Sequence, residues 1–312
     1  MKGLITRTIL ATTLLGTAAA HAQSFSNPIE IDDCTTIEGV TTDTWYVLTE
    51  DLLNCFVPIP GYVQGPAIHV KNNTGRVLID LNGRTLSNNA APNARLAIGV
   101  WIQDSPDAGV YGNYHNRSDS GQWGATITGF QRGVAIERSE GVTVGHSGRA
   151  NGGIYFEDNN YGVTASSADD VYLNHFAVRD SAVSDVDIHG SDSPIIRGLN
   201  VGSPGAYGIR LMQSPYATIW GKSGMASDNI AGIVIGRGSD GARVTQWEAN
   251  RAVEAPYAAG IVVAAEKVSL DNLTFNRTGS PNGCDIKVVY GVTMPKVGTT
   301  TTYQRKDPLV CK

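Results

Sequence analysis

The sequence predicts an all-β protein built as a solenoid of short stacked strands. Three observations lead to this prediction: many glycines, few charged residues, and a strand pattern that recurs along the chain. Glycine makes up 36 of the 312 residues, or about 11.5%, against an average of about 7%. Asp, Glu, Lys and Arg together make up 17%, against an average of about 25%. Coiled coils and helical bundles need charged surfaces and few glycines, so both are excluded. A hydrophobic content of 41% and a net charge of −5 argue against disorder.

The recurring unit begins with a small residue and continues with two apolar residues that flank one outward residue. Its clearest copies lie within residues 161–166 (YGVTAS) and 207–212 (YGIRLM), in each of which a tyrosine precedes the small residue. The predicted units start at Ala67, Gly99, Gly133, Gly162, Asp185, Gly208, Gly232 and Gly260. Turn residues separate the strands, and no stretch has a sustained helical period. This pattern favours a solenoid over a propeller, whose repeat is about 40 residues, and over a sandwich, whose strands are longer.

The first 22 residues have the pattern of a signal peptide. Lys2 and Arg7 precede the apolar stretch 9–19, and Ala20-His21-Ala22 is a small-x-small cleavage site. We therefore expect a secreted or periplasmic protein. The chain is mildly acidic and has no basic cluster, so neither nucleic acid nor an anionic membrane is expected as a partner. We also expect a monomer.

The four cysteines are Cys34, Cys55, Cys284 and Cys311, and their number agrees with an oxidising compartment. No pair has the spacing of a zinc site, and three disulfide pairings are open at this point. Acidic pairs such as residues 157–158 and 32–33 offer oxygen ligands for calcium. Isolated pairs in loops are usually only solvated, so calcium is possible but supported by no motif. We expect no metal or other cofactor.

Over about residues 62–280, the short strands and turns resemble the right-handed parallel β-helix superfamily, the pectate-lyase-like fold. The resemblance implies a single solenoid of about eight coils, with an N-terminal cap over residues 23–61 and a C-terminal cap over residues 281–312. Strands stacked about 4.8 Å apart would separate the two ends by roughly 34 Å. A disulfide needs Cα atoms within about 7 Å. The resemblance therefore implies the bridges Cys34–Cys55 and Cys284–Cys311, one clamping each end.

The outward face of the first strand in each unit is where we look for chemistry, because alternation places the apolar residues inside. Reading along the stack, the predicted outward pairs are His69 and Lys71, Trp101 and Gln103, Ala135 and Glu137, Thr164 and Ser166, Asp187 and His189, Arg210 and Met212, Val234 and Gly236, Val262 and Ala264. The polar and aromatic residues concentrate in the first six pairs, as a groove for extended carbohydrate requires. Trp101, Gln103 and Lys71 are the predicted substrate-binding residues. The alternatives are that Trp101 packs beneath a long loop such as 104–122, and that His69 and Lys71 are surface residues at the edge of the cap.

Asp187, His189, Arg210 and Glu137 are the predicted catalytic residues. In a lyase for acidic polysaccharide, Arg210 would neutralise the sugar carboxylate and His189 would move the adjacent proton. In a glycoside hydrolase, Glu137 and Asp187 would flank the scissile bond. The alternative for Asp187 and Arg210 is an ordinary cross-strand ion pair.

Comparison with particular β-helix families leaves the reaction open. The order Asp169-Asp170, Asp187-Ile188-His189-Gly190 and Gly208-Ile209-Arg210 partly resembles polygalacturonases, but the Asn-Thr-Asp element is absent. The Asp-Pro-His signature of alginate epimerases is also absent, as is the Arg-x-x-Arg-x-Pro run of classical pectate lyases. We therefore expect an exported polysaccharide lyase or glycoside hydrolase. The alternative is a non-catalytic β-helix that binds glycans or serves as a surface scaffold.

Overall fold

The computed structural model describes residues 27–60, 64–88, 97–113, 124–145, 153–203, 206–226, 231–251, 259–277, 284–302 and 310–311. These residues form strands and turns and contain no helix. No helix in this part of the chain is therefore long and apolar enough to cross a membrane. The predicted signal peptide, residues 1–22, lies outside the described residues.

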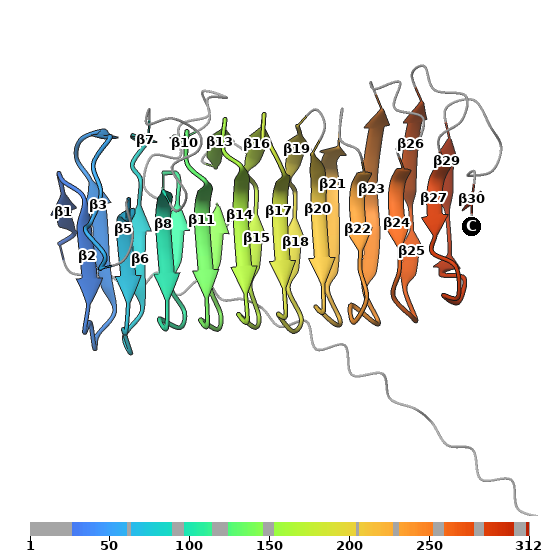
Figure 1. Cartoon of the computed structure of the whole chain (residues 1–312), viewed down its shortest axis with the longest axis horizontal. Coiled ribbons are helices and arrows are strands. Elements are labelled where there is room, and N and C mark those ends of the chain that lie inside the picture. The colour runs from blue at the N-terminus through green and yellow to red at the C-terminus, as the bar shows by residue number, and fades with distance from the viewer. Residues whose placement is uncertain are drawn as a thin grey trace, which may run out of the picture.

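Parallel strands stack side by side along the long axis of the molecule, as Figure 1 shows. The strands that carry the predicted unit starts belong to one sheet, which we call the first sheet. It consists of β2 (Thr35–Glu38), β5 (Pro66–Lys71), β8 (Ile98–Gln103), β11 (Arg132–Glu137), β14 (Tyr161–Ser166), β17 (Ser184–His189), β20 (Tyr207–Met212), β22 (Ala231–Ile235), β24 (Ala259–Val263), β27 (Cys284–Val288) and β30 (Val310–Cys311).

Each coil continues into two further sheets. The second sheet contains β1 (Ile29–Ile31), β3 (Thr44–Leu48), β6 (Val77–Asp80), β9 (Gly109–Tyr111), β12 (Thr143–Gly145), β15 (Tyr172–Asn174), β18 (Ile195–Arg197), β25 (Ser269–Asp271) and β28 (Lys296–Val297). The third contains β4 (Leu52–Leu53), β7 (Thr85–Ser87), β10 (Ala125–Thr128), β13 (Ile154–Glu157), β16 (Ala177–Arg179), β19 (Asn200–Gly202), β26 (Leu273–Arg277) and β29 (Thr300–Thr302). The nine-residue strands β21 (Thr218–Ala226) and β23 (Arg243–Arg251) run through both and join them into one hydrogen-bonded sheet.

The predicted solenoid is confirmed as a right-handed parallel β-helix. Eight strands of the first sheet, β5 to β24, carry the eight predicted unit starts. The segments expected as caps extend the same sheet, by β2 at the N-terminal end and by β27 and β30 at the C-terminal end. The ends are therefore further coils of the same solenoid.

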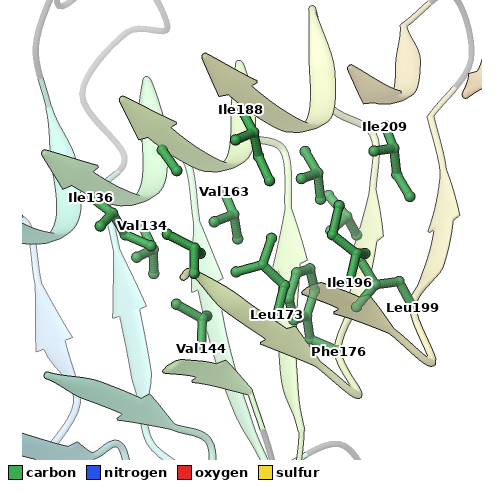
Figure 2. Packing of buried hydrophobic residues seen from close by; sticks show 14 of the residues in the cluster. Val134, Ile136, Val144, Val163, Leu173, Phe176, Ile188, Ile196, Leu199 and Ile209 are labelled. Atoms are coloured by element: carbon green, nitrogen blue, oxygen red, sulfur yellow. The ribbon is translucent and has the colours of Figure 1, made fainter. Parts of the chain in front are cut away.

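The core fills the space between the three sheets, where apolar side chains from successive coils stack on one another (Figure 2). Val163 and Ile188 of the first sheet, Leu173 of the second and the Phe176–Phe156 pair beside the third are all fully buried. The two phenylalanine rings meet edge to face with centroids 5.3 Å apart. Burying one such set in every coil is what makes a stack of short strands stable.

Close packing explains why most units start with a small residue. A Cβ added to Gly162 would lie 2.6 Å from the carbonyl oxygen of Asp185 and 2.7 Å from Cγ1 of Val178. Asp185 occupies the same place in the next coil. It is fully buried, and the Ser203 hydroxyl donates a hydrogen bond to its carboxylate.

A ladder of buried hydroxyls supports the turn between the first and second sheets. The backbone amide of Ser105 donates to Oγ of Ser139 (3.0 Å), and that of Ser214 donates to Oγ of Ser239 (3.1 Å). All four serines are buried, at 2% exposure or less. Because each hydroxyl satisfies an amide of the preceding coil, the turn is buried without losing hydrogen bonds.

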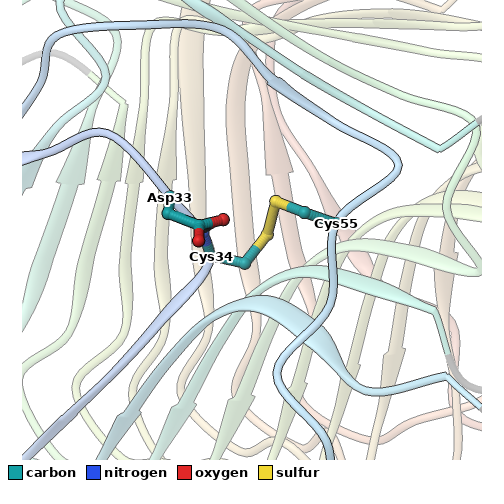
Figure 3. Close-up of a disulfide and its surroundings, with 3 residues drawn as sticks. All are labelled: Asp33, Cys34 and Cys55. Carbon is teal, nitrogen blue, oxygen red and sulfur yellow. Dashed lines mark hydrogen bonds between the residues drawn. A yellow bond between two sulfur atoms is a disulfide. The ribbon is translucent and has the colours of Figure 1, made fainter.

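Both predicted disulfides are present, Cys34–Cys55 and Cys284–Cys311, with Cα atoms 5.7 and 5.9 Å apart. Figure 3 shows the first of them beside Asp33, whose carboxylate accepts a hydrogen bond from the backbone amide of Cys34. Each bridge clamps one end of the solenoid, where unpaired strand edges would otherwise invite association with other molecules.

Candidate functional site

The outward face of the first sheet has the register that the sequence predicts. One row runs His69, Trp101, Ala135, Thr164, Asp187, Arg210, Val234, Val262, and the next runs Lys71, Gln103, Glu137, Ser166, His189, Met212. A third outward row contains Ile98, Arg132, Tyr161, Ser184 and Tyr207. Strands β14, β17 and β20 bring the polar and aromatic members of these rows together.

Asp187 and Arg210 lie opposite one another on β17 and β20 and form a two-point ion pair. Nε of Arg210 donates to Oδ1 of Asp187 at 3.0 Å, and Nη2 donates to Oδ2. The side chains are 31% and 14% exposed, respectively. Asp187 raises the pKa of Arg210, chiefly through these hydrogen bonds. The guanidinium also stands 5.8 Å from the centre of the Tyr207 ring.

His189 lies two residues beyond Asp187 on the same face and is exposed. Its neighbours in register are Ser166 and Met212. Strand geometry separates the backbones of His189 and Asp187 by roughly 6.5 Å. The imidazole is therefore accessible to a ligand that contacts the Asp187–Arg210 pair.

Glu137 pairs with an arginine of its own strand. Nη1 of Arg132 lies 3.1 Å from Oε1 of Glu137, and the side chains are 33% and 23% exposed. Arg132 is next to Tyr161 in register. The two carboxylates predicted for a hydrolase, Glu137 and Asp187, are thus each held by a different guanidinium.

Trp101 does not offer the open stacking surface that the sequence analysis predicted. It is only 8% exposed and belongs to a small cluster with Ile98, Ala135 and Ile59 on the outside of the first sheet. The His69 ring stacks on it, with centroids 4.6 Å apart and an interplanar angle of 7°. The covering residue, Ile59, comes from the segment before β5, because that segment folds back along the strand through a hydrogen bond from the Val57 amide to the Pro66 carbonyl.

Lys71 and Gln103 lie on the same side of this cluster but are engaged with neighbours. Nζ of Lys71 is 3.0 Å from Oε2 of Glu38, and Oε1 of Gln103 lies 3.2 Å from Nε2 of His69. His69, an expected surface residue, is instead 5% exposed. Burial lowers the pKa of His69. This end of the face is therefore packed, and the accessible polar groups lie further along the stack.

Tyr161 and Tyr207 are the site residues that the sequence analysis missed. They lie in one row, with Ser184 between them, on strands β14 and β20 that flank Asp187. The signal was present, since each tyrosine opens one of the two most similar repeat units. Strict alternation of inward and outward side chains, however, places the residue before the small residue inside the coil, so it predicts no outward tyrosine. In the structure two successive residues, such as Gly162 and Val163, are both buried.

Among the described residues, the His, Cys, Asp and Glu side chains whose ligand atoms gather within 4.8 Å are Asp33, Cys34 and Cys55. Both sulfurs of this group form the disulfide, so it lacks the thiolates that a metal site would use.

The sequence matches no family model and no curated protein. Solved structures with a similar chain course include the periplasmic alginate epimerase AlgG, at 10% identity over 90% of this chain and 76% of that chain, with a TM-score of 0.49. The tailspike protein of E. coli bacteriophage HK620 in complex with pentasaccharide has 11% identity over 89% and 56%, with a TM-score of 0.40. Alginate lyase from Paenibacillus sp. str. FPU-7 has 11% identity over 76% and 91%, with a TM-score of 0.34. The stacked parallel strands make this chain a parallel β-helix protein.

Proposed function

We propose that this protein binds an extracellular polysaccharide across the outer face of the first sheet, over strands β14, β17 and β20. The observation that carries the proposal is the group of Asp187, Arg210 and Tyr207, with Tyr161 on the other side of β17. Planar charged groups and aromatic rings are the side chains that hydrogen-bond to sugars and pack against them. Export through the predicted signal peptide, residues 1–22, is part of this proposal.

The ion pair leaves Arg210 able to contact a ligand. Asp187 takes hydrogen bonds from Nε and Nη2, whereas a guanidinium has five N–H donors. Among the described residues Nη1 has no acceptor, and the side chain is 31% exposed. A sugar hydroxyl or carboxylate could therefore bind at Nη1 without breaking the pair. Because both side chains are already fixed, little additional ordering is needed on binding.

A lyase reaction on an acidic polysaccharide is the second candidate, and exposed His189 beside the pair favours it. Arg210 would hold the uronate carboxylate, and His189 would take the proton from the adjacent carbon. A hydrolase is less well supported, because Glu137 and Asp187 are both engaged by arginines. The order of preference is therefore glycan binding, then lyase, then hydrolase.

The test compares polysaccharide binding and cleavage in matched variants. Arg210→Ala should weaken binding of an acidic polysaccharide, while Arg138→Ala should not. The control is well matched because Arg138 also forms a two-point pair, with Asp104 at 2.9 and 2.7 Å, but in the turn after β11. Unchanged binding in Arg210→Ala would overturn the proposal.

Release of unsaturated sugar ends, followed by their near-ultraviolet absorbance, tests the lyase. If the wild type releases such ends, His189→Ala should abolish the release while largely preserving binding. If the wild type releases none while binding persists, the protein is a binding module. If both variants cleave at the full rate, the site assignment is wrong.

A further inference from the structure

A second accessible surface lies on the second sheet, away from the proposed glycan site. It is formed by outward residues of three consecutive coils and one turn residue, and we call it the flank patch: Ile195, Arg197, Tyr216, Trp220 and Arg243. Arg197 and Trp220 are opposite one another on β18 and β21, and Thr218 lies between Ile195 and Arg243 in the next row. The patch therefore crosses the strands, parallel to the solenoid axis.

The patch is unusual for the middle of a solenoid because it exposes large apolar side chains. Ile195 is 42% exposed, Tyr216 66% and Trp220 37%. The other exposed large hydrophobic side chains among the described residues belong to the coils at the two ends: Ile29, Leu53, Tyr290 and Met294. Coil ends lack a neighbour on one side, which explains their exposure. That explanation does not apply to the flank patch, which has coils on both sides.

The aromatic ring at the centre of the patch is held in place. Cζ of Arg197 lies 4.3 Å from the centre of the Trp220 ring, a cation–π distance. Nε1 of Trp220 donates to Oε1 of Gln246 at 2.5 Å. Gln246 also lines a shallow hollow of about 330 Å³ with Trp247, Glu248, Asn272 and Thr274. A fixed, half-exposed aromatic beside a polar hollow loses little freedom when a ligand binds.

The patch also carries two arginine side chains. Arg197 has Asn174 and Trp220 as its neighbours in register, and Arg243 has Thr218 and Ser269. Within the described part of the chain, no ion pair joins either guanidinium to a carboxylate. On a chain of net charge −5, two such arginines beside exposed aromatics select for an anionic ligand.

We propose that the flank patch is a second glycan-binding surface, which takes an acidic polysaccharide of uronate type along the solenoid axis. The arginines would pair with sugar carboxylates, and Trp220 and Tyr216 would pack against the sugar rings. A polymer fits this surface because the outward rows repeat at about 4.8 Å per coil, so successive sugars meet successive coils. This surface does not depend on the first-sheet site, and two sites on one molecule would increase the avidity for a long chain.

The experiment measures binding of oligogalacturonates and oligomannuronates by calorimetry in a Tyr207→Ala/Arg210→Ala background, which removes the first-sheet contacts. Neutral dextran oligosaccharides are the ligand control. In this background one site should remain. Trp220→Ala, or Arg197→Gln with Arg243→Gln, should weaken it by about tenfold or more, and added salt should weaken it further. The matched controls, Arg179→Gln and Tyr290→Ala, change exposed residues elsewhere and should leave affinity unchanged.

The absence of oligouronate binding in the background variant would overturn the proposal, and so would equal affinity in the flank variants and the controls. Urea unfolding of each variant verifies that the solenoid is intact. Failure of the first-sheet proposal gives a different result: the wild type and the Tyr207→Ala/Arg210→Ala variant would then bind oligouronate with the same stoichiometry. Binding of dextran as tight as that of oligouronate would refute the role of the two arginines.

Discussion

The Asp187–Arg210 pair gives a quantitative test of how far the outer face of the first sheet is prearranged. The perturbation is a double-mutant cycle of Asp187→Asn and Arg210→Ala. The pair has two-point geometry, and its side chains are 14% and 31% exposed. It therefore lies between two measured limits. Fully exposed pairs contribute about 0.2–1 kcal/mol, and loss of one partner of a buried pair costs about 3–5 kcal/mol.

We expect Arg210→Ala to lower the free energy of unfolding by about 2 kcal/mol, since a carboxylate that is mostly buried loses its partner. The coupling energy of the cycle should be about 1–2 kcal/mol. The Asp104–Arg138 pair has the same two-point geometry but side-chain exposures of 39% and 52%. Its coupling should be much smaller and should fade as salt is added, because solvent and ions screen exposed charges.

Urea unfolding followed by circular dichroism gives the four free energies, with the m-value checked for each variant. A coupling below about 0.5 kcal/mol for Asp187–Arg210, or a coupling equal to that of Asp104–Arg138, would refute the reasoning. It would mean that the pair is as mobile as an ordinary surface pair. The prearrangement on which the binding proposal rests would then be lost.

Three further predictions concern the solenoid. Replacing Cys284 and Cys311 by serine opens a loop with a sequence separation of 27 and should lower the free energy of unfolding by roughly 3–4 kcal/mol in urea; a loss below about 1 kcal/mol contradicts an end-clamping role. Burial lowers the pKa of His69, so its neutral form stabilises the fold above pH about 6.5, and that contribution is lost as the pH falls through the folded-state pKa. Urea titrations from pH 7.5 to 4.5 should show a shallower acid loss in His69→Gln than in the wild type; identical slopes for the two proteins would exclude His69. Phe176→Ala removes a fully buried ring and should cost about 3–5 kcal/mol, against less than about 1.5 for Phe176→Leu; equal losses for both would show that the core relaxes around the cavity.

The candidate site was predicted in its rows but not in its contacts. Alternation of apolar and polar residues fixes which side chains face outward, so the placement of Asp187 and Arg210 side by side followed from the sequence alone. Alternation cannot show what lies above the sheet. The sequence therefore left two alternatives for Trp101, an open stacking surface or packing beneath a loop, and in the structure Ile59 and His69 pack against it. The segment that contains Ile59 has no repeat of its own to predict its path.

The residues that complete the site depended on a local irregularity. Tyr161 and Tyr207 face outward because the small residue after each of them and the next apolar residue are both buried. Strict alternation puts a tyrosine at this position inside the coil. Only the backbone geometry of the three sheets shows that the row of tyrosines lies beside Asp187.

By itself, the sequence determined the repeat, the eight unit starts between residues 62 and 280, and the register of two of the outer rows. These follow from local rules: turn residues, small unit starts and the two-residue period of a strand repeat in each coil. The tertiary structure decided which outward residues pair, which are covered and where apolar groups stay exposed, as at Trp220. Those outcomes depend on contacts between different coils and on segments that do not repeat. The sequence pattern therefore defines the solenoid, and only packing across coils defines its binding surfaces.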